Sequence, residues 1–154
     1  NKWISNTNSC QFFKYRSEVW LCSYWMILKV PQEDIHLVWN ETEPLLKKAL
    51  DDCYTADDIL KGLINNSFQL FISWNKKVEC AVVTEVAQYP QKKICRYFLA
   101  GGSNLNNWLE PIQTEIEKFA KLNKCQAIEV AGRKGWAKKL KGYEQKIYLF
   151  SKEL

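Results

Sequence analysis

The stretch KKICRYFLAGGSNLNNWLEPIQTEIEKFAKLNKCQAIEVAG, residues 92–132, decides the fold of this chain. Its first part, residues 92–100, alternates between polar and apolar residues and ends in an apolar run, which predicts a strand. Gly101 and Gly102 are then expected to break the strand, because paired glycines accept positive φ and let another backbone or a ligand approach closely. Apolar residues at helical spacing follow and predict an amphipathic helix, namely Leu105, Trp108, Leu109, Ile112, Ile116, Phe119 and Ala120.

The start of this helix is the first candidate site. Asn104, Asn106 or Asn107 can cap it, and Pro111 comes early enough to be tolerated in its first turns. A strand that leads through a turn into a helix points backbone N–H groups at open space, which favours anions and phosphates. The stretch then continues into a second strand at residues 126–131.

The segments before this stretch predict two helices and three further strands. A strand at Met26–Val30 is followed by a helix that Asp34 caps and that Glu43-Pro44 restarts. Thr55 to Asp58 has the spacing of a capping box, with Asp in place of Glu, at the start of the next helix. The helices are followed by strands at residues 68–74 and 78–89.

The connections predict how the strands pair. Short loops join the strands at residues 68–74, 78–89 and 92–100, so we expect an antiparallel meander. The long helix then crosses over to residues 126–131, so that strand should lie parallel to residues 92–100. A glycine turn, a short helix and a final strand at residues 146–154 complete a mixed α/β sheet.

The composition is that of an ordinary globular protein. With 154 residues, 47% hydrophobic and 25% charged, one domain with a substantial core is the default. The net charge of +5 comes largely from basic residues after residue 117. These residues form a solvated face, or they contact a phosphate-bearing cofactor or an acidic protein. The sequence has no basic stripe with interleaved aromatic residues, which disfavours nucleic-acid binding.

The cysteines and histidine predict no metal site. The six cysteines are widely spread with no C-x-x-C pair, and His36 is the single histidine. We interpret the cysteines as reduced, with Cys80 and Cys95 as small buried thiols, and the protein as cytoplasmic. No run of eighteen apolar residues is present, so no membrane span is expected.

Residues 1–25 differ from the rest of the chain. They contain three of the seven tryptophans, and their apolar residues show no clear helical or strand periodicity. Met26 is the only methionine, which leads to the hypothesis that it is the natural start and that residues 1–25 precede the working protein. The alternative, held equally, is an ordinary N-terminal extension with an added helix.

The order of elements from residue 26 to residue 154 resembles the GNAT (Gcn5-related N-acetyltransferase) fold. The late segment IEVAGRKGWAKKLKGYEQKIYLF resembles a small phage-encoded GNAT-like group, in which G-R-x-G-W precedes a helix and a Gly-Tyr turn. That group also tends to have a T-E strand, a Tyr-Pro turn and a Gly-Gly turn, here Thr84-Glu85, Tyr89-Pro90 and Gly101-Gly102.

The resemblance implies acetyl-CoA as cofactor, with its pyrophosphate on the amides of the turn before the long helix. The strand before that turn, residues 94–100, would splay from its neighbour. The family turn reads Q/R-x-x-G-x-G/A, whereas this chain has AGGSNLNNW with adjacent glycines. The cofactor-binding residues carried over are Leu99, Ala100, Gly101, Gly102, Ser103, Asn104, Arg133 and Trp136.

Arg133, set between two glycines, has three open roles. Its guanidinium could grip a phosphate or carboxylate in a bidentate manner, cap the last carbonyls of the long helix, or stack on Trp136.

The resemblance also suggests the chemistry. A base removes a proton from the amine, and an acid protonates the leaving thiolate. Glu85 is the candidate base, with a solvent-facing strand carboxylate as the alternative. Tyr148 is a weak candidate acid, because Tyr143 is expected to be a packing residue, and His36 is expected to be a surface residue.

Two functions remain open at this point. The first is an acyl-CoA-dependent N-acetyltransferase that acts on an unknown amine. The second is a catalytically silent GNAT-fold protein that serves a phage as a virion component or binds a host protein. The non-standard turn, the lack of a clear acid and the many tryptophans favour the second, and the sequence gives no oligomeric state.

Overall fold

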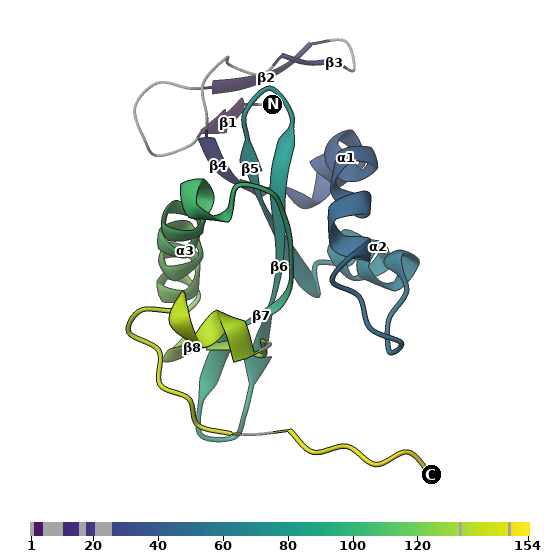
Figure 1. Cartoon of the computed structure of the whole chain (residues 1–154). Helices are drawn as coiled ribbons and strands as arrows, with labels where there is room; N and C mark the ends of the chain where they lie inside the picture. The colour runs from purple at the N-terminus through teal and green to yellow at the C-terminus, as the bar shows by residue number, and fades with distance from the viewer. Residues whose placement is uncertain (1, 5–10, 16–17, 21–25, 133, 148) are drawn as a thin grey trace.

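A central β-sheet with helices on both faces organises the molecule (Figure 1). The computed structural model describes residues 2–4, 11–15, 18–20, 26–132, 134–147 and 149–154. The central sheet contains β4 (Met26–Val30), β5 (Phe68–Trp74), β6 (Val78–Gln88), β7 (Lys93–Gly102) and β8 (Ala127–Val130), in that order across the sheet.

The pairing of the sheet confirms the predicted meander and crossover. β4, β5, β6 and β7 pair antiparallel with their neighbours, and β8 lies parallel to β7. β5 is apolar on both faces because both are covered: Leu70 and Ile72 pack toward α1 and α2, and Phe71 packs toward α3.

The helix α1 (Ile35–Lys47) follows a short 3-10 helix, η1 (Gln32–Asp34), and runs without a break. The predicted restart at Glu43-Pro44 is therefore wrong. Pro44 lies inside α1, and two residues earlier the buried Thr42 hydroxyl donates to the Val38 carbonyl at 2.8 Å. The packing of Leu46, which is 1% exposed, holds the last turn against the sheet and outweighs the proline.

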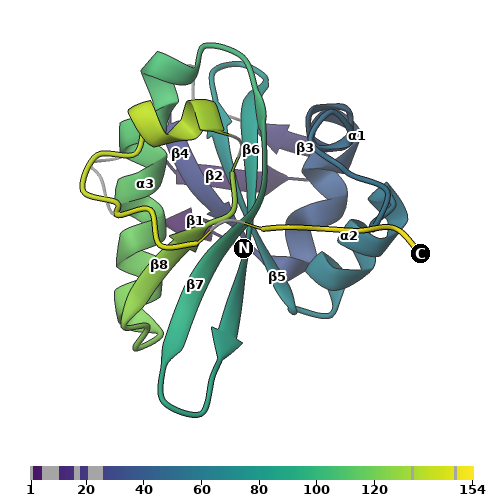
Figure 2. The ribbon, with the colours of Figure 1, turned by 60° about the horizontal axis from the view of Figure 1, so that its bottom comes forward.

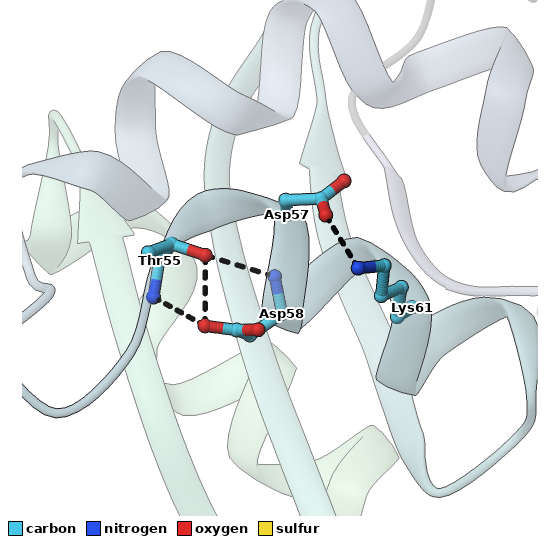
Figure 3. A network of polar contacts seen from close by, with 4 residues as sticks. All are labelled: Thr55, Asp57, Asp58 and Lys61. Atoms are coloured by element: carbon cyan, nitrogen blue, oxygen red, sulfur yellow. Dashed lines mark hydrogen bonds and ion pairs between the residues drawn. The ribbon is translucent and has the colours of Figure 1, made fainter.

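The helix α2 (Ala56–Ile64) begins with the predicted capping box (Figure 3). The Asp58 backbone N–H donates to the Thr55 hydroxyl at 3.2 Å, and the Thr55 backbone N–H donates to the Asp58 carboxylate at 2.8 Å. Lys61 forms an ion pair with Asp57 at 2.8 Å one turn later. Asp thus replaces Glu in the box, because its shorter side chain still reaches back to the N-cap amide.

The long helix α3 (Leu105–Leu122) covers the other face of the sheet (Figure 1). Its predicted apolar face is confirmed, because Trp108, Ile112, Ile116 and Ala120 are buried against the sheet. Pro111 lies inside the helix and early enough to be accommodated.

The described part of residues 1–25 consists of strands. β1 (Lys2–Ile4), β2 (Gln11–Tyr15) and β3 (Glu18–Trp20) pair antiparallel in the order β1-β2-β3. The expectation of an added helix is wrong for these residues.

The C-terminal residues depart from the predicted final strand. A short 3-10 helix, η2 (Lys134–Lys138), is where a helix was expected. The described residues 143–147 and 149–154 form no strand, and Ile147, Leu149 and Phe150 are each more than 80% exposed. A strand needs a hydrogen-bonding partner, and in this structure these residues lie beside no strand of the described sheet.

Candidate functional site

A β-bulge in β7 marks the point where the central sheet opens. In the pairing with β6, Tyr97 lies opposite Thr84 and Leu99 lies opposite Val83, so Phe98 is the extra residue. The pairing of β7 with β8 ends at Tyr97 and Val130. Among the described residues, the part of β7 after Tyr97 therefore pairs with β6 alone, and its other edge has no strand beside it.

The two glycines do not break the strand, contrary to the prediction, because β7 runs through both to Gly102. A Cβ on Gly101 would lie 2.1 Å from the Leu45 carbonyl oxygen in α1. Gly102 has φ +150° and pairs with Cys80, and a Cβ there would lie 2.5 Å from the Glu79 carbonyl oxygen. Protein backbone thus fills the space that the missing side chains leave.

The turn into α3 consists of Ser103 and Asn104. The Ser103 N–H donates to the Glu79 carbonyl at 3.0 Å, and the Trp108 indole N–H donates to the Ser103 carbonyl. Asn104 occupies the N-cap position with left-handed φ 55°, but its side chain makes no capping hydrogen bond. The first turn of α3 also contains no acidic residue. The positive end of the dipole of this 18-residue helix therefore lies at backbone N–H groups that the Asn104 side chain does not cap. Such groups favour the binding of an anion.

The carboxylate of Glu85 is engaged in an ion pair. Its Oε1 accepts from Arg96 Nη1 at 2.7 Å, and Arg96 Nη2 donates to the Tyr89 hydroxyl at 2.5 Å. Arg96 Nη2 also lies 3.7 Å from a Glu129 carboxylate oxygen. The side chain of Glu85 is 25% exposed, so it is neither a fully solvated carboxylate nor a buried one. To act as a base, the Glu85 carboxylate would first have to leave its ion pair with Arg96 and bind another partner.

Three aromatic rings lie beside this ion pair at the bulge. Phe98 stacks on Phe68, with ring centroids 5.0 Å apart, and meets Tyr54 edge to face at 4.8 Å. Phe68 is the register partner of Glu85 on the neighbouring strand, so these rings and the carboxylate share one face of the sheet. Gly62 in α2 makes room for the Phe68 ring, because a Cβ there would lie 2.2 Å from it.

Arg96 and the aromatic rings were missed from the sequence, although part of the signal was present. The hairpin closes with the Tyr89 N–H donating to the Lys92 carbonyl at 2.7 Å. From this turn the two strands pair residue by residue, through Glu85 opposite Arg96, as far as Thr84 opposite Tyr97. Counting back from the predicted turn would have found the pair of Glu85 with Arg96. The stacking on Phe98 had no such signal, because it depends on the bulge.

A pair of tyrosines lies on the other face, where β7 and β8 part. Tyr97 is 7% exposed, and burial, with the nearby Tyr143 hydroxyl, raises its pKa. Burial also raises the pKa of Tyr143. Both hydroxyl oxygens are shielded from solvent, so Tyr143 is the packing residue that the sequence predicts. A hydroxyl whose pKa is raised holds its proton more tightly and is a weaker acid than a free tyrosine, so both groups act in packing.

Of the remaining predicted residues, some lie in the described part of the chain and others lie outside it. Leu99 and Ala100 lie half-buried on β7 after the bulge, so the structure brings residues 99–104 together at the end of the strand. The Trp136 indole lies over Gly132, where a Cβ would be 3.1 Å from the ring. Arg133 and Tyr148 lie outside the described residues.

Two of the cysteines are buried thiols, as the sequence predicts. Cys80 and Cys95 are 0% exposed, and burial raises their pKa to about 12 and about 11. In the described chain, one group of three potential metal ligands gathers, Asp51, Asp52 and Cys53, in an exposed turn. The Asp51 carboxylate raises the pKa of the Cys53 thiol, which opposes the thiolate form that a metal requires.

A hollow of about 370 Å³ lies between η1, α1 and α2, away from the end of β7. Gln32, His36, Trp39 and Leu60 are among its lining residues, and His36 is exposed there as predicted. Within the described ranges, no helix combines the length and hydropathy needed to cross a bilayer.

Comparison with known proteins supports the fold. No family model and no curated protein matches the sequence. Among solved structures, a GNAT family acetyltransferase from Staphylococcus aureus has TM-score 0.63 and 16% identity over 84% of this chain and 98% of that one. An aminoglycoside acetyltransferase from an uncultured soil metagenomic sample, solved with trehalose, has TM-score 0.63 and 15% identity over 84% and 96%.

A third similar structure is a predicted acetyltransferase with acetyl-CoA from Clostridium acetobutylicum, with TM-score 0.62 and 14% identity over 84% of this chain and 96% of that one. Identities this low show shared architecture alone. The predicted fold is confirmed: a mixed sheet with three antiparallel pairings and one parallel pairing, as in GNAT acetyltransferases.

Proposed function

We propose that this protein is an acyl-CoA-dependent N-acetyltransferase, which transfers an acetyl group from acetyl-CoA to an amine. The observation that carries the proposal is the sequence of features along β7: a bulge at Phe98, an edge without a strand partner after Tyr97, and then the uncapped start of α3. Together they offer backbone groups for an extended ligand with an anion at one end.

The residues at the end of β7 fit such a cofactor. The backbone of Leu99 and Ala100 would form hydrogen bonds with its amide groups, because this edge of β7 has no strand partner among the described residues. The amides from Asn104 onward would bind its pyrophosphate. Ser103 contributes little, since its N–H donates to Glu79. Gly101 and Gly102 act by packing, while Arg133 and Trp136 are proposed as further contacts.

Bound acetyl-CoA would supply a thioester that an amine can attack. The Glu85 carboxylate would take a proton from the amine, directly or through water, after exchanging Arg96 for the substrate. The aromatic rings of Phe98 and Tyr54 would exclude water on the same face. Tyr148 remains the proposed acid from the sequence.

Titration calorimetry with acetyl-CoA tests the proposal. Asn106 is exposed in the first turn of α3, so Asn106→Asp adds a negative charge where the pyrophosphate would bind. The same charge favours the helix dipole by about 0.3–1 kcal/mol, so binding should weaken while the protein stays folded. Gln91→Glu in the exposed β6–β7 turn is the matched control and should bind like the unmodified protein. Absence of binding to the unmodified, folded protein would refute the cofactor assignment.

A second candidate function is a catalytically silent GNAT-fold protein that binds a host or virion protein. The observation that favours it is the ion pair of Glu85 with Arg96, which already occupies the candidate base. We further propose, from the segment around Trp136, that the protein is phage-encoded and acts in the host cytoplasm. Its amine substrate or protein partner would be found there.

A further inference from the structure

The Glu85–Arg96 ion pair belongs to a row of charges on three neighbouring strands. Arg96 on β7 has Glu85 on β6 as one register partner and Glu129 on β8 as the other. Register partners point to the same face of a sheet, so the row reads negative, positive, negative. The Arg96 guanidinium lies 2.7 Å from Glu85 and 3.7 Å from Glu129. The row therefore carries one excess negative charge.

This row lies on the sheet face that α1 and α2 cover, at the end of their cover. Phe68, the register partner of Glu85 on β5, packs into the core cluster beneath these two helices. Beyond it, the β6–β7 hairpin projects past α2 and α3 (Figure 2). The side chain of Arg96 is accordingly 29% exposed and that of Glu129 49% exposed. The charges are thus ordered by the sheet and still open to a small ligand.

Two exposed tyrosines flank the ion pair. Tyr89 is 43% exposed, and its hydroxyl accepts a hydrogen bond from Arg96 at 2.5 Å. Tyr54 is 41% exposed and belongs to the group of aromatic rings at the bulge. A charged centre between accessible aromatic side chains can bind a small molecule by charge and by contact with its apolar part.

We propose that this row binds the amine substrate, and that the substrate carries a carboxylate close to its amine, as an amino acid does. This inference rests on the proposed acetyl transfer and names the substrate class of that site. The substrate ammonium pairs with Glu85 in place of Arg96, and the substrate carboxylate pairs with Arg96 in place of Glu85. A guanidinium suits the second contact, because it binds a carboxylate through two parallel N–H···O bonds.

The carboxylate is what makes opening the ion pair favourable. An amine without one would bind Glu85 and lie against the positive charge of Arg96, which is directly opposite on the next strand. Separation of a partly buried pair is unfavourable unless both charges are paired again. Glu129 compensates Arg96 only weakly, because it is half exposed and 3.7 Å away. An amino acid supplies a new partner to both groups at once.

The row also lies close to the proposed cofactor site. Arg96 precedes Tyr97, where the pairing of β7 with β8 ends and the edge proposed for acetyl-CoA begins. An amine paired with Glu85 therefore lies beside that edge. Acetyl transfer to it forms the N–C bond and breaks the thioester C–S bond. Of the two protons that the ammonium loses, one goes to Glu85 and then to solvent, and the other goes to the leaving sulfur.

The first test measures binding without acetyl-CoA, by chemical-shift changes of the ¹⁵N-labelled protein. The ligands are matched pairs that differ by the carboxylate: lysine and cadaverine, phenylalanine and phenethylamine, alanine and ethylamine. At least one amino acid should bind about tenfold or more tightly than its amine, as expected for one charged hydrogen-bonded contact. Equal binding within every pair, or no binding of any amino acid, would overturn the inference.

Substitution of Arg96 makes this test specific. Arg96→Gln should weaken binding of the amino acids and strengthen binding of the amines, because it removes the carboxylate partner and releases Glu85. A merely structural role of Arg96 would weaken both classes. Lys93→Gln is the matched control, since it removes the same charge from the opposite face of β7. An unchanged preference in Arg96→Gln would contradict the assignment.

The second test separates this inference from the proposed function. Acetylated products are measured by mass spectrometry with acetyl-CoA and the same pairs, and kcat/KM should be about tenfold or more higher for the preferred amino acid than for its amine. Acetylation of the amines at equal kcat/KM would support the enzyme and overturn the amino-acid class. Preferential binding of amino acids by a protein that binds no acetyl-CoA would refute the proposed function and support the site.

Discussion

Replacement of Gly101 by alanine tests the packing on which the end of β7 depends. A Cβ at this position would lie 2.1 Å from the carbonyl oxygen of Leu45 and 2.8 Å from its carbonyl carbon, and both atoms belong to the backbone of α1. A helix backbone cannot rotate out of the way as a flexible side chain can, so α1 or β7 must shift. Forcing an extra carbon into a packed interior costs about 1–3 kcal/mol. We expect Gly101→Ala to lower the free energy of unfolding by ~3 kcal/mol, the upper end of that range.

The assay is urea unfolding followed by circular dichroism, with Gly135→Ala as the matched control. A Cβ on Gly135 meets nothing within 4 Å, so its free energy of unfolding should change by less than about 0.5 kcal/mol. For a chain of this size a loss of ~3 kcal/mol lowers Tm by roughly 6–12 °C. Equal stability of the two variants would refute the claim that the α1 backbone touches β7. It would also restore Gly101 as a residue kept small for a ligand.

Two further predictions concern single side chains. Thr55→Ala removes one half of the capping box with Asp58 and should reduce the free energy of unfolding by about 1 kcal/mol, measured by urea unfolding; an unchanged midpoint would contradict the box. At pH 8, a thiol reagent should label the exposed Cys53 before the buried Cys80. Because the Asp51 carboxylate raises the pKa of Cys53, Asp51→Asn should lower that pKa, increase the thiolate fraction and speed labelling, whereas a slower rate would contradict the assignment.

Local patterns were sufficient to predict most of the fold. The helical spacing in α3 placed its buried face correctly, from Trp108 to Ala120, because an amphipathic helix on a sheet has one apolar stripe. The capping box at Thr55 is a contact within four residues and depends on nothing distant. The short loop after Gln88 fixed the antiparallel pairing of β6 and β7.

The errors share a different cause, since each depends on residues distant in the sequence. Pro44 was expected to interrupt α1, but the burial of Leu46 against the sheet keeps the helix continuous. Gly101 was expected to end a strand, but its role is set by Leu45, which is 56 positions away in the chain. The bulge at Phe98 has no local signal, because it exists only in the register with β6.

The packing role of the glycines changes how the turn should be interpreted. The two glycines are adjacent, whereas the GNAT turn has alternate glycines. If the glycines served to let a phosphate approach the backbone, this difference would argue against cofactor binding. In this chain Gly101 is matched to α1 and Gly102 to β6, so packing alone accounts for both. The amides from Asn104 to Asn106 lie after the glycines and have no side-chain cap from Asn104. Their capacity to bind pyrophosphate is therefore independent of the glycine pattern. The charge substitution at Asn106, rather than a bulky residue at Gly102, is the change that separates the enzyme from the silent scaffold.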